Sequence, residues 1–274
     1  MLIYRLISGI SISAFVLLTI LVFPNWFFAF ITIMLIVVGL YEFFTLVEKK
    51  GIPIYKYFGI FIGIMIPLST YFKFEPTKGW ELFFIAAACM CLFLAQFTRR
   101  KNTHAIAGIS TTLFGIVYVS WFFTFMIKLK FAQDMNPSLN GANLVLFLLL
   151  VTKLGDVGSY FIGSLAGKHS LIARISPKKS VEGAIGGLLC SALTAYLSRG
   201  LLPGGIPVYH FLILGISLGI LAQIGDLSES LIKRDCKVKD SGSVVPGMGG
   251  ILDIIDSVLF TTPIFYFYMR FLLP

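Results

Sequence analysis

Long apolar runs dominate this sequence and limit what it can fold into. Hydrophobic residues make up 57% of the 274 positions and charged residues only 13%, which is far from the balance of a soluble domain. A helix that crosses a bilayer needs roughly 20 mostly apolar residues, because the hydrocarbon offers no water to its backbone groups. The sequence therefore predicts an all-α, polytopic integral membrane protein.

Nine stretches meet this requirement, and we expect each to form a transmembrane helix. They cover residues 6–23, 26–47, 54–72, 81–97, 105–127, 142–165, 184–197, 208–227 and 251–268. The seventh is the shortest. No small-residue cleavage site follows the first, and further apolar stretches come at once, so we interpret it as a helix and not as a secretory signal.

Basic residues are distributed unevenly between the loops. If the N-terminus is cytoplasmic, fifteen of the 22 Lys and Arg residues lie in cytoplasmic loops and six outside, while Lys153 falls within a span. This asymmetry follows the positive-inside rule, which fixes orientation through Lys and Arg. The net charge of +9 is thereby explained without a nucleic-acid partner, and the N-terminus is predicted to be cytoplasmic.

Polar residues concentrate in the second half of the chain. We interpret residues 1–140, which are rich in Phe, Ile and Leu, as N-terminal scaffold helices. Residues 141–274 are interpreted as the catalytic half of the same continuous membrane domain. This half contains the polar segments KLGDVGSYFIG, GKHSLIARISPKKSVEGAIGG, QIGDLSESLIKR and KDSGSVVPGMGGILDIID.

Five carboxylates lie in or against the apolar stretches of the second half: Asp156, Asp226, Glu229, Asp253 and Asp256. Such charges cost several kcal/mol unless they are paired, hydrated or metal-bound, so they are candidates for function. A spacing of three residues puts Asp226 with Glu229, and Asp253 with Asp256, on one helix face each. A hairpin can bring both pairs to the same depth, where a divalent cation would relieve their repulsion.

The available ligands indicate which cation and which substrate group to expect. No Cys/His set has the spacing of a zinc site, and the four cysteines are predicted to be free thiols. The ligands left are carboxylate oxygens, which favour Mg²⁺. A second cation could also bind. The glycines of PGMGG, residues 246–250, let the backbone approach a ligand closely. The helix that starts near Ile251 is expected to direct free N–H groups toward a phosphate.

Structural roles remain open for some of these groups. Glu229 and Lys233 could form an ion pair at i,i+4, and Lys153 and Asp156 one at i,i+3. The loop lysines could serve only as topology signals, and PGMGG only as a turn before a helix. A purely structural role for Asp226, Asp253 and Asp256 together is disfavoured, because desolvated carboxylates are too costly as packing.

The run SLIKRDCKVKDSGSVVPGMGGILDIID, residues 230–256, resembles the signature of phosphatidate cytidylyltransferases, also called CDP-diacylglycerol synthases. The segments GDLSES, SPKKSVEGAIGG and KLGDVGSYFIG also look like parts of that family. The resemblance covers the C-terminal half closely and the N-terminal half only in hydropathy. Two positions depart from the signature: Met248 replaces a His, and Ile254 replaces an Arg.

The resemblance implies a Mg²⁺-dependent transfer of the cytidylyl group from CTP to phosphatidate, which gives CDP-diacylglycerol and pyrophosphate for phospholipid synthesis. It implies catalytic roles for Asp226, Asp253, Asp256 and Lys233, with the three aspartates as metal ligands. The expected partners are CTP, phosphatidate and the bilayer, with a homodimer as an option and no nucleic acid. The expected substrate-binding residues are Ser176, Lys178, Lys179, Arg234, Lys239, Asp240, Gly249 and Gly250.

We expect the phosphatidate phosphate to attack the α-phosphorus of CTP in line at the cytoplasmic face, without a covalent enzyme intermediate. Positioning and charge neutralisation would then dominate catalysis. Three alternatives remain: another CTP-dependent lipid transferase or kinase, a cation transporter that uses the carboxylates as an ion path, and an inactive relative, as Met248 and Ile254 would allow.

Overall fold

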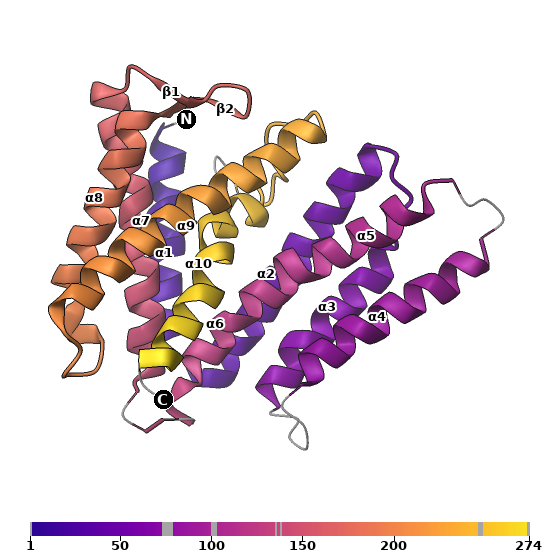
Figure 1. The fold of residues 1–274 in the computed structure, drawn as a ribbon, viewed down its shortest axis with the longest axis horizontal. Helices are drawn as coiled ribbons and strands as arrows, with labels where there is room; N and C mark the ends of the chain where they lie inside the picture. The colour runs from indigo at the N-terminus through magenta and orange to yellow at the C-terminus, as the bar shows by residue number, and fades with distance from the viewer. Residues whose placement is uncertain are drawn as a thin grey trace.

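The computed structural model describes residues 2–72, 79–99, 103–134, 136–137, 139–245 and 249–272. These residues are mostly helical (Figure 1). A two-stranded antiparallel hairpin, β1 (Ser170–Ile172) with β2 (Ser176–Ser180), is the only sheet within them. The α-helices are α1 (Leu2–Leu21), α2 (Asn25–Lys49), α3 (Lys56–Tyr71), α4 (Trp80–Phe97), α5 (Ala105–Gly115), α6 (Phe122–Lys130), α7 (Gly141–Ala166), α8 (Val181–Leu197), α9 (Val208–Asp235) and α10 (Ile251–Leu272).

Six of the described helical segments are long and apolar enough to cross a membrane. They are α2, α4, the continuous segment Ala105–Lys130 formed by α5 and α6, α7, α9 and α10. The chain is therefore an all-α integral membrane protein. The larger number of nine spans and the cytoplasmic N-terminus stay predictions.

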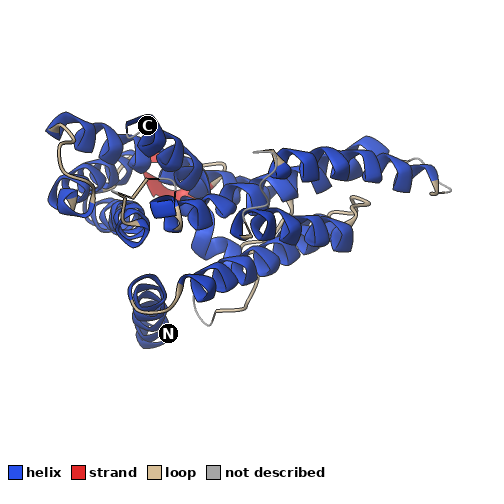
Figure 2. Cartoon of the chain, turned by 90° about the horizontal axis from the view of Figure 1, so that it is seen from below, coloured by secondary structure: helices blue, strands red, loops and turns tan. Residues whose placement is uncertain are grey.

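Helix α10 lies between two groups of helices (Figure 1). It packs against α9 and α7 on one side and against α6 and α2 on the other. Helix α8 covers α7 and α9, while α3, α4 and α5 extend the group around α2 and α6. In the view from below, the N-terminal helix α1 lies to one side of the other helices (Figure 2). The main buried cluster contains residues from both groups, such as Phe43, Phe125, Phe147 and Phe265.

Small residues set the closest helix contacts in the second half. A Cβ atom added at Gly155 of α7 would lie 2.1 Å from the Ser191 Oγ of α8, and one at Gly158 would lie 2.4 Å from the Cys190 Sγ. Lipid tails are as apolar as the helix surfaces, so the hydrophobic effect does not drive helices together inside a membrane. Close backbone approach is then a main source of helix–helix association. The glycine-rich sequence of these two segments thus explains why α7 and α8 pair tightly.

Two local features differ from the expected spans. Helix α9 continues to Asp235, eight residues beyond the predicted end at 227, because SESLIKRD contains good helix formers and no Gly or Pro. The predicted span 105–127 contains a π-helical turn, Ile116–Trp121, between α5 and α6. The first difference matters for the site, because it puts Glu229 and Lys233 on the same continuous helix as Asp226.

Candidate active site

The predicted carboxylates of α9 and α10 gather where the last turns of α9 pack against the first turns of α10. The two helices approach closely at Gly225, where an added Cβ would lie 2.4 Å from the backbone oxygen of Asp256. Because Asp226 follows this glycine directly, the contact brings Asp226 next to Asp256. The expected hairpin between the two carboxylate pairs is therefore confirmed.

Asp253 is held by a dense set of donors. Its Oδ1 accepts from the Lys233 Nζ at 2.5 Å. Its Oδ2 accepts from the Ser241 backbone N at 2.9 Å, the Ser241 Oγ at 2.8 Å and the Gly250 N at 2.8 Å. Hydrogen bonds to an ionised group are about twice as strong as neutral ones, so Asp253 is fixed between α9, α10 and the loop that joins them.

Lys233 stands between two carboxylates. It forms an ion pair with the Glu229 Oε2 one turn earlier on α9 and a second with Asp253 across the hairpin. The i,i+4 pair that the sequence allowed is thus confirmed, but it is one half of a bridge between two helices. Because Glu229 is completely buried, its charge depends on Lys233 for compensation.

Asp226, Asp256 and Asp156 form a second group. The Lys179 Nζ of β2 lies 2.6 Å from the Asp226 Oδ2. Asp256 is buried, at 8% exposure. The Asp156 Oδ2 accepts from the Ser257 Oγ at 2.9 Å. The three carboxylates are close enough for their charges to interact, so negative charge from α7, α9 and α10 converges here.

Lys153 links α7 to α10 beside this group. Its Nζ lies 3.6 Å from the Asp156 Oδ2, as the i,i+3 spacing allowed. It also donates to the Ile254 carbonyl oxygen at 2.9 Å and to the Ser257 Oγ at 2.8 Å. The pair therefore has a structural function, since it connects two helices. Ile254, one of the two departures from the family signature, takes part through its backbone.

The described carboxylates form no preformed metal cage, although their oxygen donors are of the kind that Mg²⁺ prefers. Among the described residues, no three Asp, Glu, His or Cys side chains converge enough to hold a metal ion. Lys179 and Lys233 stand beside Asp226 and Asp253, where the cation was expected. Mg²⁺, however, usually takes one or two carboxylates and completes its shell with water and substrate phosphates. Asp226 and Asp256, whose charges interact, would supply that number of carboxylates.

The expected substrate-binding residues surround this group unevenly. Arg234 donates to the backbone oxygens of Ile175 at 3.2 Å and Val238 at 3.3 Å, so it ties the hairpin to the end of α9. Lys179 points into the carboxylates, and Ser176 starts β2 half-buried. Three further residues are exposed at the rim: Lys178, Lys239 and Asp240.

The start of α10 differs from the expectation of free N–H groups. The Gly250 N donates to Asp253, while the Ile251 and Leu252 N–H groups donate to Glu42 of α2 at 3.0 and 2.9 Å. The prediction that these donors face a phosphate is therefore wrong. Two carboxylates of the protein accept the hydrogen bonds of these N–H groups, because the positive end of a helix attracts nearby anions. The left-handed φ of +97° at Gly249 makes the tight entry possible, whereas residues 246–248, with Met248, lie outside the described residues.

Two residues of the first half reach this region, and the sequence motifs indicated neither. Glu42 is a lone carboxylate in an apolar stretch, and the cost of membrane-buried charge would have marked it. Tyr118 is 2% exposed, and its hydroxyl has no hydrogen-bond partner among the described residues. It lies within electrostatic range of Asp226, Glu229 and Asp256, on a π-helical turn of a kind often found at functional sites.

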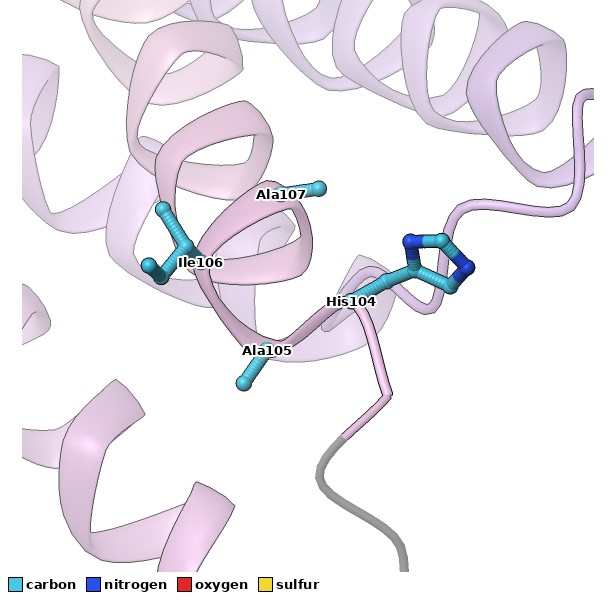
Figure 3. A pocket seen from close by; sticks show the side chains of 4 residues that line it. All are labelled: His104, Ala105, Ile106 and Ala107. Atoms are coloured by element: carbon cyan, nitrogen blue, oxygen red, sulfur yellow. The ribbon is translucent and has the colours of Figure 1, made fainter.

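A separate depression lies at the start of α5, lined by His104, Ala105, Ile106 and Ala107 (Figure 3). The imidazole of His104 extends away from the helix there. None of the predicted site residues lines this depression. It therefore has no part in the chemistry of the carboxylate site.

Known proteins resemble this chain along its whole length. The model of the cytidylyltransferase family matches residues 3–272. A phosphatidate cytidylyltransferase of Synechocystis sp. is 34% identical over 98% of this chain and 97% of its own length. One of Bacillus subtilis is 29% identical over 97% and 96%, respectively, and one of Staphylococcus saprophyticus is 34% identical over 80% of each. The similarity thus includes the first half, where the sequence motifs alone showed only hydropathy.

Proposed function

Because this chain belongs to the cytidylyltransferase family, we propose that it transfers the cytidylyl group of CTP to phosphatidate and releases CDP-diacylglycerol and pyrophosphate. The observation that carries this conclusion is the nearly full-length similarity to proteins named phosphatidate cytidylyltransferase. A polyprenol kinase and a cation transporter are not favoured by these names. The enzyme is an integral membrane transferase of phospholipid synthesis.

The reaction needs no covalent enzyme intermediate. An oxygen of the phosphatidate phosphate forms a bond to the α-phosphorus of CTP, and the bond from that phosphorus to the bridging oxygen breaks as pyrophosphate leaves. Both substrates are anions, so the protein contributes chiefly by holding them in line and compensating their charge. Lys179 is suited to this task, because it belongs to the β1–β2 hairpin and its Nζ lies beside the Asp226 carboxylate.

We assign the role of holding Mg²⁺ to Asp226 and Asp256, supported by their adjacency at Gly225. The ion would neutralise phosphate charge and orient both substrates. Lys179, which neutralises Asp226 in the absence of ligand, would then be released to a substrate phosphate. The fixed contacts of Asp253 support a positioning role for that carboxylate and for Lys233.

We place the site at the cytoplasmic face. The end of α9, the β1–β2 hairpin and the loop after α9 contain Lys178, Lys179, Lys233, Arg234 and Lys239, and such basic loops are typical of the cytoplasmic side. CTP is a cytoplasmic solute, so this orientation gives the nucleotide direct access. A cysteine placed at exposed Lys239 should be labelled by a membrane-impermeant reagent only from the cytoplasmic side.

The test is an assay of the purified protein in detergent with labelled CTP and phosphatidate. We expect labelled CDP-diacylglycerol, loss of product with a chelator, and recovery with added Mg²⁺. No product from phosphatidate, together with product from a polyprenol acceptor, would overturn the assignment of substrate. Full turnover in the presence of chelator would remove the metal role but leave the transfer reaction standing.

A further inference from the structure

A carboxylate from the first half of the chain is built into the start of α10. Glu42, on α2, is 5% exposed. Its Oε1 accepts from the Ile251 N at 3.0 Å and its Oε2 from the Leu252 N at 2.9 Å. Glu42 thus caps α10 from another helix, 209 residues earlier in the chain.

The same carboxylate shares a serine with Asp253. The Ser241 Oγ lies 3.2 Å from the Glu42 Oε2 and 2.8 Å from the Asp253 Oδ2. The N–H groups at the start of α10 also donate to both carboxylates, since the Gly250 N donates to Asp253 while the next two N–H groups donate to Glu42. Any shift of Glu42 therefore changes the donors available to Asp253, and with them the position of the helix turn that carries Asp256.

Two glycines enclose the carboxylate. A Cβ at Gly242 would lie 2.4 Å from the Glu42 Oε1, and a Cβ at Gly250 would lie 2.4 Å from the Glu42 Oε2. The chain between α9 and α10 thus approaches the Glu42 carboxylate at two glycines, where any side chain would displace it. The two glycines therefore leave room for the Glu42 carboxylate where a larger residue would crowd it.

No cation pairs with Glu42 among the described residues. Its charge is balanced instead by backbone N–H groups, the Ser241 hydroxyl and the positive end of α10. This differs from Glu48 on the same helix, which forms an ordinary ion pair with Lys56 at 3.1 Å and is half-exposed. Glu42 is therefore arranged to orient a helix end.

We infer that Glu42 is a positioning residue of the active site: by capping α10 and sharing Ser241, it sets where Asp253 and Asp256 stand relative to α9. This inference rests on the proposed function. It assigns to the first half of the chain a direct part in the geometry of catalysis. It also explains why the loop carries glycine at both 242 and 250.

The test compares Glu42→Gln with Glu48→Gln as a matched control on α2. Gln keeps the size of Glu42 but removes its charge and one acceptor. We expect kcat of E42Q to fall about tenfold to a hundredfold. The KM for CTP should stay nearly unchanged, because Glu42 is buried and its oxygens accept from backbone N–H groups and Ser241. We expect E48Q to keep the parent kcat. Amide hydrogen exchange in the peptide covering residues 250–256 should rise in E42Q only.

Unchanged kcat in folded E42Q would overturn the inference, even if amide exchange rises, because the contact would then be structural alone. If E42Q does not fold, Gly242→Ala provides the second variant, since it crowds the same carboxylate without removing charge. Folded G242A with the parent kcat would equally overturn it. If the unmodified protein were inactive, the proposed function would be refuted instead. The difference in amide hydrogen exchange between E42Q and the parent would still test whether Glu42 caps α10.

Discussion

The two aspartates of α10 lie three residues apart on one helix face, yet their surroundings differ. Asp253 accepts four hydrogen bonds, from Lys233, Ser241 and Gly250. Among the residues that the structure describes, Asp256 accepts one, from the backbone N of the next residue, Ser257, and its charged neighbours include Lys153, Asp226 and Asp156. A carboxylate with four hydrogen bonds holds the local structure, whereas Asp256, with one hydrogen bond among the described residues, keeps acceptor sites that the proposed cation would use.

The largest effect is expected for Asp256→Asn. Removing one of the carboxylates assigned to the cation should lower kcat by about 10²–10³-fold, as for other electrostatic groups of active sites. The thermal unfolding midpoint in detergent should stay level or rise, because one buried negative charge among several is removed. Turnover and unfolding are measured on the same purified sample.

Asp235→Asn serves as its control. Asp235 ends α9, is exposed and pairs with Lys50 outside the carboxylate group. It should keep the parent turnover and the parent unfolding midpoint. If D256N remained active while losing stability, the contrast between the two aspartates of α10 would be reversed.

Asp253→Asn should instead lower stability as well as activity. The substitution weakens the ion pair to Lys233 and the hydrogen bonds from Ser241 and Gly250. Losing a hydrogen-bonded charge of this kind costs about 1.5–3 kcal/mol. Denaturant unfolding in detergent, compared with D256N under the same conditions, measures the difference. Equal stability of the two variants would contradict the division of roles.

The smallest effect concerns the hairpin that carries Lys179. Glu182, at the start of α8, contacts the His169 Nδ1 at 2.6 Å and accepts from the backbone N atoms of Lys168 and His169. The contact with His169, followed by the backbone N–H groups of Glu182 itself, Lys168 and His169, lowers the pKa of Glu182 from its usual 4.5 to about 2. A lowered pKa in the folded state means that the carboxylate stabilises the hairpin above about pH 4.5 and loses this effect as the pH falls toward 2.

Glu182→Gln should therefore unfold slightly below the parent at pH 6 and together with it near pH 2. Its kcat at pH 7 should fall by less than about twofold, because the group is on the surface, where such pairs contribute little. The unfolding midpoint of both proteins across this pH range is the measurement. A gap that stays constant down to pH 2 would show that the carboxylate charge is not its source.

The residue pattern alone accounted for a large part of this protein. Apolar runs predicted the helices, because hydrophobic length and backbone satisfaction in a bilayer leave few other structures. Local spacing allowed the Glu229–Lys233 and Lys153–Asp156 pairs, since neighbours at three and four positions share a helix face. The need to compensate buried charge marked Asp226, Asp253 and Asp256 as functional candidates from residue type and hydropathy alone.

The tertiary structure decided which charges meet. Nothing local in the sequence links Lys179 to Asp226, or Glu42 to the N–H groups of Ile251 and Leu252, because these contacts depend on how helices distant in sequence pack. The same packing filled the start of α10 with carboxylates where free donors were expected. Periodicity determines which face of a helix a residue occupies, and only the packed bundle determines which face lies opposite.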